Sequence, residues 1–471
     1  MPALRPLLHT AALALPQLAG AALALVAAMT LPPAAFGSYT LALVFAEAGI
    51  ALGQTGFCHL VVTRAGPDSA RMIATLARVQ LALGCLTGMA LALLSGPLAR
   101  VFGAPEMAPL LLVLALFQPL AAQAGWQAAR LMRAGRMGAY ARAQGGAHLL
   151  ALILGTGGLL LFASPWALIA ARGARAVSGL LLLSRAAGPA PAHPFSPALA
   201  REAVGYARGL WGARGLSFAA QYGGDLVLGL GAGPEAAGLY RAAHRLAGAG
   251  LDLILAPLRL LALRDLGQAA QKGAALSPRL TTALTAAAAL GGGMAGALWM
   301  LGPAVVSTLF RPDYAPTAPL VGVLALRALL LFPLDLTEAY AAATRRTSRA
   351  MGLQAQAGAL AGLACLAAPF GLWPLALAQT GAAALIALRV WVWLDRPALT
   401  PVAGAAGLAL LYTGALSVPR AETLIPALTA AALLALPALW IAARTGTLRA
   451  LDLRAPNPSP PHATPPPPLP S

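Results

Sequence analysis

PAAFGSY at residues 33–39 and PEAAGLY at residues 234–240 share a Pro-x-x-x-Gly-x-Tyr pattern, and each stands between two hydrophobic runs. Further along, APLLLVLAL at 108–116 matches APLVGVLAL at 318–326 at seven of nine positions. Both pairs keep an offset of about 200 to 210 residues. Chance similarity is the alternative in a chain rich in Ala and Leu, although the Pro, Gly and Tyr of the turn are not those residues. The pattern indicates a duplicated membrane lobe, of the kind from which transporters are commonly built.

The composition supports a membrane protein. Hydrophobic residues make up 59% of the chain, charged residues only 10%, and the mean hydropathy is +0.75. Apolar runs of about twenty residues follow one another with short breaks, which is typical of a polytopic helical membrane protein. The net charge of +18 raises the question of nucleic-acid binding. However, the arginines lie in short loops rather than on one basic face, so we expect no nucleic-acid partner.

The apolar runs predict an all-α fold with about fourteen membrane spans. The expected spans are 7–29, 38–62, 76–95, 107–130, 145–163, 165–184, 207–231, 236–260, 280–301, 317–343, 352–371, 373–394, 400–418 and 423–443. Basic residues concentrate in alternate loops, such as 130–142 and 345–349. By the positive-inside rule, both termini are then expected to face the cytoplasm.

This count divides the chain into two lobes and an appendix. Spans 1 to 6 form the expected N-lobe at 1–185, and spans 7 to 12 form the C-lobe at 207–396. A polar interlobe linker at 186–206 joins them on the cytoplasmic side. Because each copy holds an even number of spans, the lobes should form a parallel repeat with a pseudo-twofold axis along the membrane normal. Two extra helices at 397–444 and a Pro-rich, disordered cytoplasmic tail at 445–471 complete the prediction.

Arginines inside the predicted spans are the main candidates for substrate binding, because charge at bilayer depth is costly unless it faces a cavity. Arg172 and Arg175 are three residues apart on one helical face and could grip a diphosphate, unless the true span is shifted and both are interfacial. The full set of substrate-binding candidates is Arg172, Arg175, Arg214, Arg241, Arg245 and Arg327.

Four acids are candidates for coupling or gating: Glu47, Asp225, Asp252 and Asp335. Asp225 and Arg241 should approach each other, either as a structural pair or as a pair that breaks during transport. Glu47 is the only acid deep in the first lobe and could bind H+ or Na+, or could be a protonated structural group. The three cysteines stand alone in apolar runs, so we expect no metal and no cofactor beyond such a coupling ion.

Three stretches resemble a known family. Asp225 followed by LVLGLGAGPEAAGLYRAAHRLAG, the turn LPPAAFGSYTLAL at 31–43, and LFRPDYAPTAPLVGVLAL at 309–326 are similar to the Wzx-like polysaccharide and oligosaccharide flippases of the MATE-like exporter superfamily. The resemblance implies a two-lobed transporter in the bacterial inner membrane. It would carry a polyprenyl-diphosphate-linked oligosaccharide to the outer leaflet for lipopolysaccharide or exopolysaccharide biosynthesis. Membrane lipids, a polysaccharide polymerase and chain-length proteins are the implied partners.

Two other classes of protein are weighed against this flippase. A cation-coupled multidrug exporter of the same superfamily should prefer an acidic cavity, whereas this chain offers more arginine than carboxylate at membrane depth. A membrane-bound polysaccharide polymerase or ligase should carry catalytic groups on a large outer loop, and every expected outer loop is short. No nucleophile-base pattern, nucleotide-binding loop or metal-ligand cluster is visible in the sequence. We therefore expect a protein that is not an enzyme.

Overall fold

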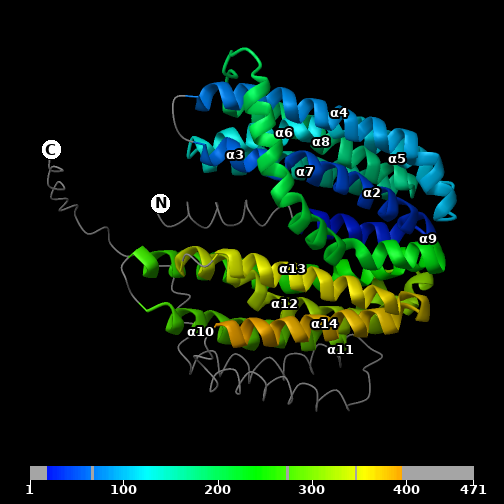
Figure 1. Cartoon of the computed structure of the whole chain (residues 1–471). Helices are drawn as coiled ribbons and strands as arrows, with labels where there is room; N and C mark the ends of the chain where they lie inside the picture. Colours follow the sequence, from blue (N-terminus) through cyan, green and yellow to red (C-terminus); the bar gives the residue numbers. More distant parts are fainter. Residues whose placement is uncertain (1–17, 65–67, 272–274, 345–346, 395–471) are drawn as a thin grey trace, which may run out of the picture.

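A computed structural model describes residues 18–64, 68–271, 275–344 and 347–394, and every regular element in these ranges is helical. Figure 1 shows two groups of helices, with α2 to α8 in one, α10 to α14 in the other, and the long helix α9 running between them. A short apolar helix, Leu18–Thr30, precedes α2. We call the two groups the N-terminal and C-terminal bundles.

The N-terminal bundle consists of seven helices whose boundaries follow proline and glycine. The helices are α2 (Pro33–Gln54), α3 (Phe57–Thr63), α4 (Ser69–Val101), α5 (Met107–Leu116), α6 (Gln118–Arg133), α7 (Met137–Phe162) and α8 (Pro165–Ala187). Pro33 and Pro165 occupy first helical positions, where a missing N–H costs nothing. Gly56, at φ 85°, separates α2 from α3. The axes of α5 and α6 differ by 43° across Phe117.

The C-terminal bundle begins within α9 (Pro197–Gln271), which contains a break. Gly233 has φ 82° and ψ 177°, and the chain folds back there, so the halves of α9 lie against each other. The remaining elements are α10 (Ser277–Ala286), a π-helix (Ala287–Gly291), α11 (Gly292–Leu309), a 3-10 helix (Pro312–Thr317), α12 (Ala318–Thr344), α13 (Thr347–Ala364), a 3-10 helix (Cys365–Phe370) and α14 (Leu372–Trp393).

The prediction of an all-α polytopic membrane fold is confirmed, but the number of spans is not fixed at fourteen. Within the described ranges, nine helices are long and apolar enough to cross a membrane, or ten if the bent pair α5 and α6 is one span. One of these, Arg214–Gly267, covers most of the expected span 207–231 and all of the expected span 236–260. The expected spans at 400–418 and 423–443, the tail at 445–471, and the first part of span 7–29 lie outside the described residues.

The two copies of the repeated turn meet each other at one helix crossing. A Cβ atom placed on Gly37 of α2 would overlap the carbonyl oxygen of Pro234. Reciprocally, a Cβ atom placed on Gly238 of α9 would overlap the carbonyl oxygen of Pro33. Equivalent atoms of the two copies thus make equivalent contacts, as an isologous twofold interface does. The glycine of each turn is required because backbone from the other copy occupies the space of a side chain.

The start of α9 is anchored in the N-terminal bundle. Ala203 and Ala207 are fully buried in a cluster with Phe57 and Trp126. A carboxylate oxygen of Glu202 accepts from Arg64 at 2.5 Å, at the same end of α9. Because His244 in the second half of α9 contacts Arg327 of α12, this one helix is anchored in both bundles.

Gly233→Ala should destabilise the protein through backbone strain alone. Nothing lies within 4 Å of a Cβ at this position, but its φ of 82° is a conformation that L-residues rarely adopt. We expect a loss of about 1–3 kcal/mol in the free energy of unfolding, measured on the detergent-solubilised protein. Gly231→Ala is the matched control, since it also meets open space but without positive φ. Equal stability of the two variants would contradict the prediction.

Candidate functional site: an arginine-lined cavity pair

Two cavities lie between α2 and α9, and they share lining residues. The first has a volume of about 230 Å³ and extends to α7, α8 and the helix Leu18–Thr30. The second has a volume of about 530 Å³ and lies further along α2, past Ile50 and Gln54. Glu47 and Tyr222 line both cavities, so these residues lie where the two spaces meet. The pair of cavities is thus bounded by both bundles.

Four of the predicted arginines line the first cavity. Arg172 and Arg175 come from α8, and Arg241 and Arg245 come from the second half of α9. Each pair is three or four residues apart on its helix and therefore presents one face. Arg214, from the first half of α9, lines the second cavity. The fold-back at Gly233 is what brings arginines of both halves of α9 to the two adjoining cavities.

Glu47 and Arg172 form an ion pair between α2 and α8 inside the first cavity. Their side chains are 27% and 17% exposed, so both remain accessible from the cavity. Glu47 is the single carboxylate among the described residues that line either cavity. Five arginines therefore face one carboxylate there, and the local charge is strongly positive.

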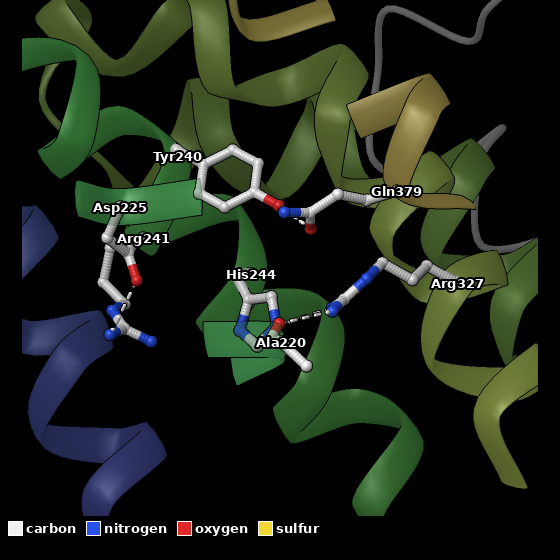
Figure 2. Close-up of polar contacts among 7 residues, drawn as sticks. All are labelled: Ala220, Asp225, Tyr240, Arg241, His244, Arg327 and Gln379. Carbon is white, nitrogen blue, oxygen red and sulfur yellow. Dashed lines mark hydrogen bonds and ion pairs between the residues drawn. The ribbon is translucent and has the colours of Figure 1, made fainter. Parts of the chain in front are cut away.

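Asp225 and Arg241 form a second ion pair, one that is almost completely buried (Figure 2). The guanidinium Nη2 and a carboxylate oxygen are 2.8 Å apart, and the side chains of Asp225 and Arg241 are 2% and 4% exposed. The Arg241 guanidinium also lies over the ring of Tyr222, with its Cζ 4.9 Å from the ring centroid. The pair ties the two halves of α9 together close to Gly233, and Arg241 also belongs to the lining of the first cavity.

Arg327 lies in a polar network within the C-terminal bundle and does not line the two cavities. Figure 2 shows its guanidinium directed at His244 and at the carbonyl of Ala220, with nitrogen contacts of 3.1 Å and 3.2 Å respectively. Because a guanidinium only donates, Nε2 of His244 accepts here, and its other ring nitrogen carries the proton. Nearby, the Tyr240 hydroxyl donates to Gln379 at 2.6 Å. This network holds α9, α12 and α14 together.

The remaining two acids line neither cavity. Asp335 of α12 pairs with Arg259 of α9 at 2.7 Å, and both side chains are partly exposed. Asp252 is partly buried on α9 and lines neither cavity. The structure thus brings together seven of the ten candidates, namely Glu47, Arg172, Arg175, Arg214, Asp225, Arg241 and Arg245. Arg327, Asp252 and Asp335 line neither cavity.

Sequence reasoning does not select three residues that also line the first cavity: Tyr39, His148 and Tyr222. The position of His148 near the end of an expected span marks it as unremarkable. Tyr39 carries a usable signal, because it belongs to the repeated turn. Its counterpart Tyr240 faces the C-terminal bundle instead, so the two copies use the same tyrosine differently.

The arrangement is suited to binding an anion. Guanidinium groups stay charged at any physiological pH, and their planar donors match phosphate oxygens in pairs. The tyrosine hydroxyls and the amides of Gln54 and Gln221 add neutral donors along the same surface. A ligand with both phosphate and polyhydroxyl parts would find partners for each.

Comparison with solved structures defines the class of protein. The fold is similar to "Lipid II flippase MurJ, inward closed conformation" with a TM-score of 0.74 and 11% identity, covering 93% of this chain and 99% of that one. It is also similar to the inward-facing conformation of a multidrug resistance MATE family transporter of the MOP superfamily, with a TM-score of 0.60 and 14% identity, covering 81% and 94% of the two chains. A third structure, of the MATE multidrug transporter DinF-BH, has a TM-score of 0.56 and 16% identity, covering 82% and 95%. The chain is thus a polytopic helical membrane protein with the fold of MurJ and of MATE transporters.

The family is defined by the sequence itself. Residues 26–319 match the family described as "Polysaccharide biosynthesis protein", and the chain belongs to that family. Among curated proteins, none matches the chain significantly.

Proposed function

We propose that this protein is a flippase that moves a polyprenyl-diphosphate-linked oligosaccharide across the bacterial inner membrane for surface polysaccharide biosynthesis. The observation that carries the proposal is the pair of adjoining cavities between the bundles, lined by five arginines and one carboxylate. Membership of a polysaccharide biosynthesis family and the fold shared with a lipid II flippase support it.

The proposed mechanism is alternating access of the cavity pair to the two sides of the membrane. The diphosphate enters with the sugar from the cytoplasmic side and binds Arg172, Arg175 and Arg245, while the lipid tail stays in the bilayer. Binding partly neutralises the arginines, which lowers the cost of keeping so much positive charge at membrane depth. The bundles then rock about the crossing of α2 and α9, and the substrate is released on the outer side. Either H+ or Na+ would serve as the coupling ion.

A cation-coupled multidrug exporter is the second candidate, because two of the similar structures are of MATE multidrug transporters. The charge of the cavities is the observation that ranks it lower, since five arginines would repel the cationic drugs that an acidic cavity attracts. Drug-resistance profiling of an overexpressing strain separates the two. Raised resistance to cationic drugs would favour the exporter, and an unchanged profile is expected for the flippase.

The decisive test removes the arginines that face the first cavity from both bundles. We expect the triple variant Arg172→Ala, Arg175→Ala, Arg245→Ala to abolish surface polysaccharide in a strain that depends on this protein, with the variant still present in the membrane. The matched control is the triple lysine variant, which keeps the charge and should retain part of the export. Arg100→Ala, an exposed residue at the end of α4, should export normally. Unaltered export by the triple alanine variant would overturn the proposal.

The proposal contains no bond-making step. A polymerase and chain-length proteins would act on the sugar after it reaches the outer leaflet, where they are the expected partners. Release of polymer or transfer of a glycosyl group by the purified protein, supplied with a lipid-linked sugar, would contradict this part of the proposal.

A further inference from the structure

The ion pair of Glu47 and Arg172 lies where the two cavities meet. Glu47 lines both cavities, and its partner Arg172 lines the first, so the pair lies where a substrate would pass from one space to the other. Tyr222 is the other described residue that lines both spaces. An anion that reaches the arginines of the first cavity from the second must therefore pass this carboxylate.

The accessibility of this pair distinguishes it from its neighbour. Glu47 and Arg172 are 27% and 17% exposed, whereas Asp225 and Arg241 are 2% and 4% exposed. A partly exposed pair stabilises a protein little, because water screens it, and its carboxylate can turn away at small cost. A buried pair cannot separate without leaving uncompensated charge. Of the two pairs, only that of Glu47 and Arg172 can therefore separate at small cost.

We propose that Glu47 is a displaceable counter-ion, which neutralises Arg172 while the site is empty and yields it to the phosphate groups of the substrate. This inference rests on the proposed function and assigns Glu47 a role in selectivity. A diphosphate can engage several of the arginines at once and brings two or more negative charges, so it outcompetes a single carboxylate. A small monovalent anion such as chloride offers one charge and no bidentate geometry. Glu47 therefore excludes common anions and admits polyvalent phosphates.

The role differs from that of a coupling residue, which is one of the two roles that the sequence leaves open for Glu47. A coupling carboxylate exchanges H+ or Na+ with the two sides of the membrane, and its neutralisation stops transport. A counter-ion competes with the substrate for an arginine, and its neutralisation strengthens binding of anions. The two roles thus predict opposite changes in the affinity for phosphate.

The test is calorimetric titration of the purified full-length protein with inorganic pyrophosphate, in low-chloride buffer and again with added chloride. Glu47→Gln should bind pyrophosphate about fivefold more tightly than the wild type, which corresponds to about 1 kcal/mol for a partly exposed pair. Added chloride should weaken binding to this variant more than binding to the wild type. Glu47→Asp, which keeps the charge, should resemble the wild type.

Two controls make the outcome specific. Glu202→Gln breaks the pair with Arg64, which lies outside both cavities, and should leave pyrophosphate binding unchanged. Adding Arg172→Gln to Glu47→Gln should remove the gain in affinity. Unchanged or weaker pyrophosphate binding by Glu47→Gln, or no binding by either protein, would overturn the counter-ion role. The flippase proposal is judged separately, by export in the triple alanine variant.

Discussion

Asp225→Ala is expected to lower the free energy of unfolding of the detergent-solubilised protein by about 3–5 kcal/mol. The variant leaves the Arg241 guanidinium, which is 4% exposed, without its ionic partner between the halves of α9. A lone charge in such surroundings has lost its hydration and gains little in return. Thermal and denaturant unfolding, followed by circular dichroism, measure the loss.

The control for this prediction is an exposed ion pair in the same chain. Arg311 and Asp313 are 3.4 Å apart, with side chains 42% and 51% exposed, so Asp313→Ala should cost at most about 1 kcal/mol. The double variant Asp225→Leu, Arg241→Met removes both charges and should recover much of the stability lost by Asp225→Ala. Similar losses for Asp225→Ala and Asp313→Ala would show that the buried pair does not hold α9 together.

Gly37→Ala and Gly238→Ala form the second large prediction, and each should destabilise the protein by about 1–3 kcal/mol or more. The added methyl group would overlap the carbonyl oxygen of Pro234 in one case and that of Pro33 in the other. Backbone cannot turn aside as a flexible side chain can, so α2 and α9 must separate. The comparison is again by thermal and denaturant unfolding.

Both variants lose stability because α2 and α9 must separate, so their losses in the free energy of unfolding should not be additive. Once one methyl group has parted the helices, the second costs less, so the double variant should lose less than the sum of the two. Gly248→Ala on the same helix α9 meets nothing within 4 Å and should not lower stability. Additive losses, or a loss for Gly248→Ala as large as for Gly238→Ala, would contradict the reciprocal contact.

The fold could be predicted from the sequence because its strongest signals are local. Apolar runs of membrane length define helices, and the repeated turn marks equivalent points in two halves of the chain. The prediction that Asp225 and Arg241 approach each other is confirmed, with Nη2 of Arg241 2.8 Å from a carboxylate oxygen of Asp225. The reason is local, because a short turn at Gly233 places the two segments that flank it side by side.

The candidate site could be predicted only in part, because helical periodicity tells which residues share a face but not what that face contacts. The depth of Arg327 in its span predicts a place in the cavity, whereas α12 turns this arginine toward His244. The pairing of Glu47 with Arg172 joins residues 125 positions apart and carries no sequence signal. The same holds for Tyr222, whose importance arises from its place between two spaces.

Because α9 is anchored in both bundles, it limits how the two bundles can move relative to each other. Its first turns are fixed by Phe57 and Trp126, and it is fixed to α12 from Ala220 onward by Arg327. Any relative rotation of the two bundles must therefore be absorbed by flexure of the stretch between these anchors. Three glycines lie in that stretch with nothing within 4 Å of their missing side chains: Gly209, Gly212 and Gly215. Arg214 lies among these glycines, so bending of α9 in this stretch would move one of the five cavity arginines.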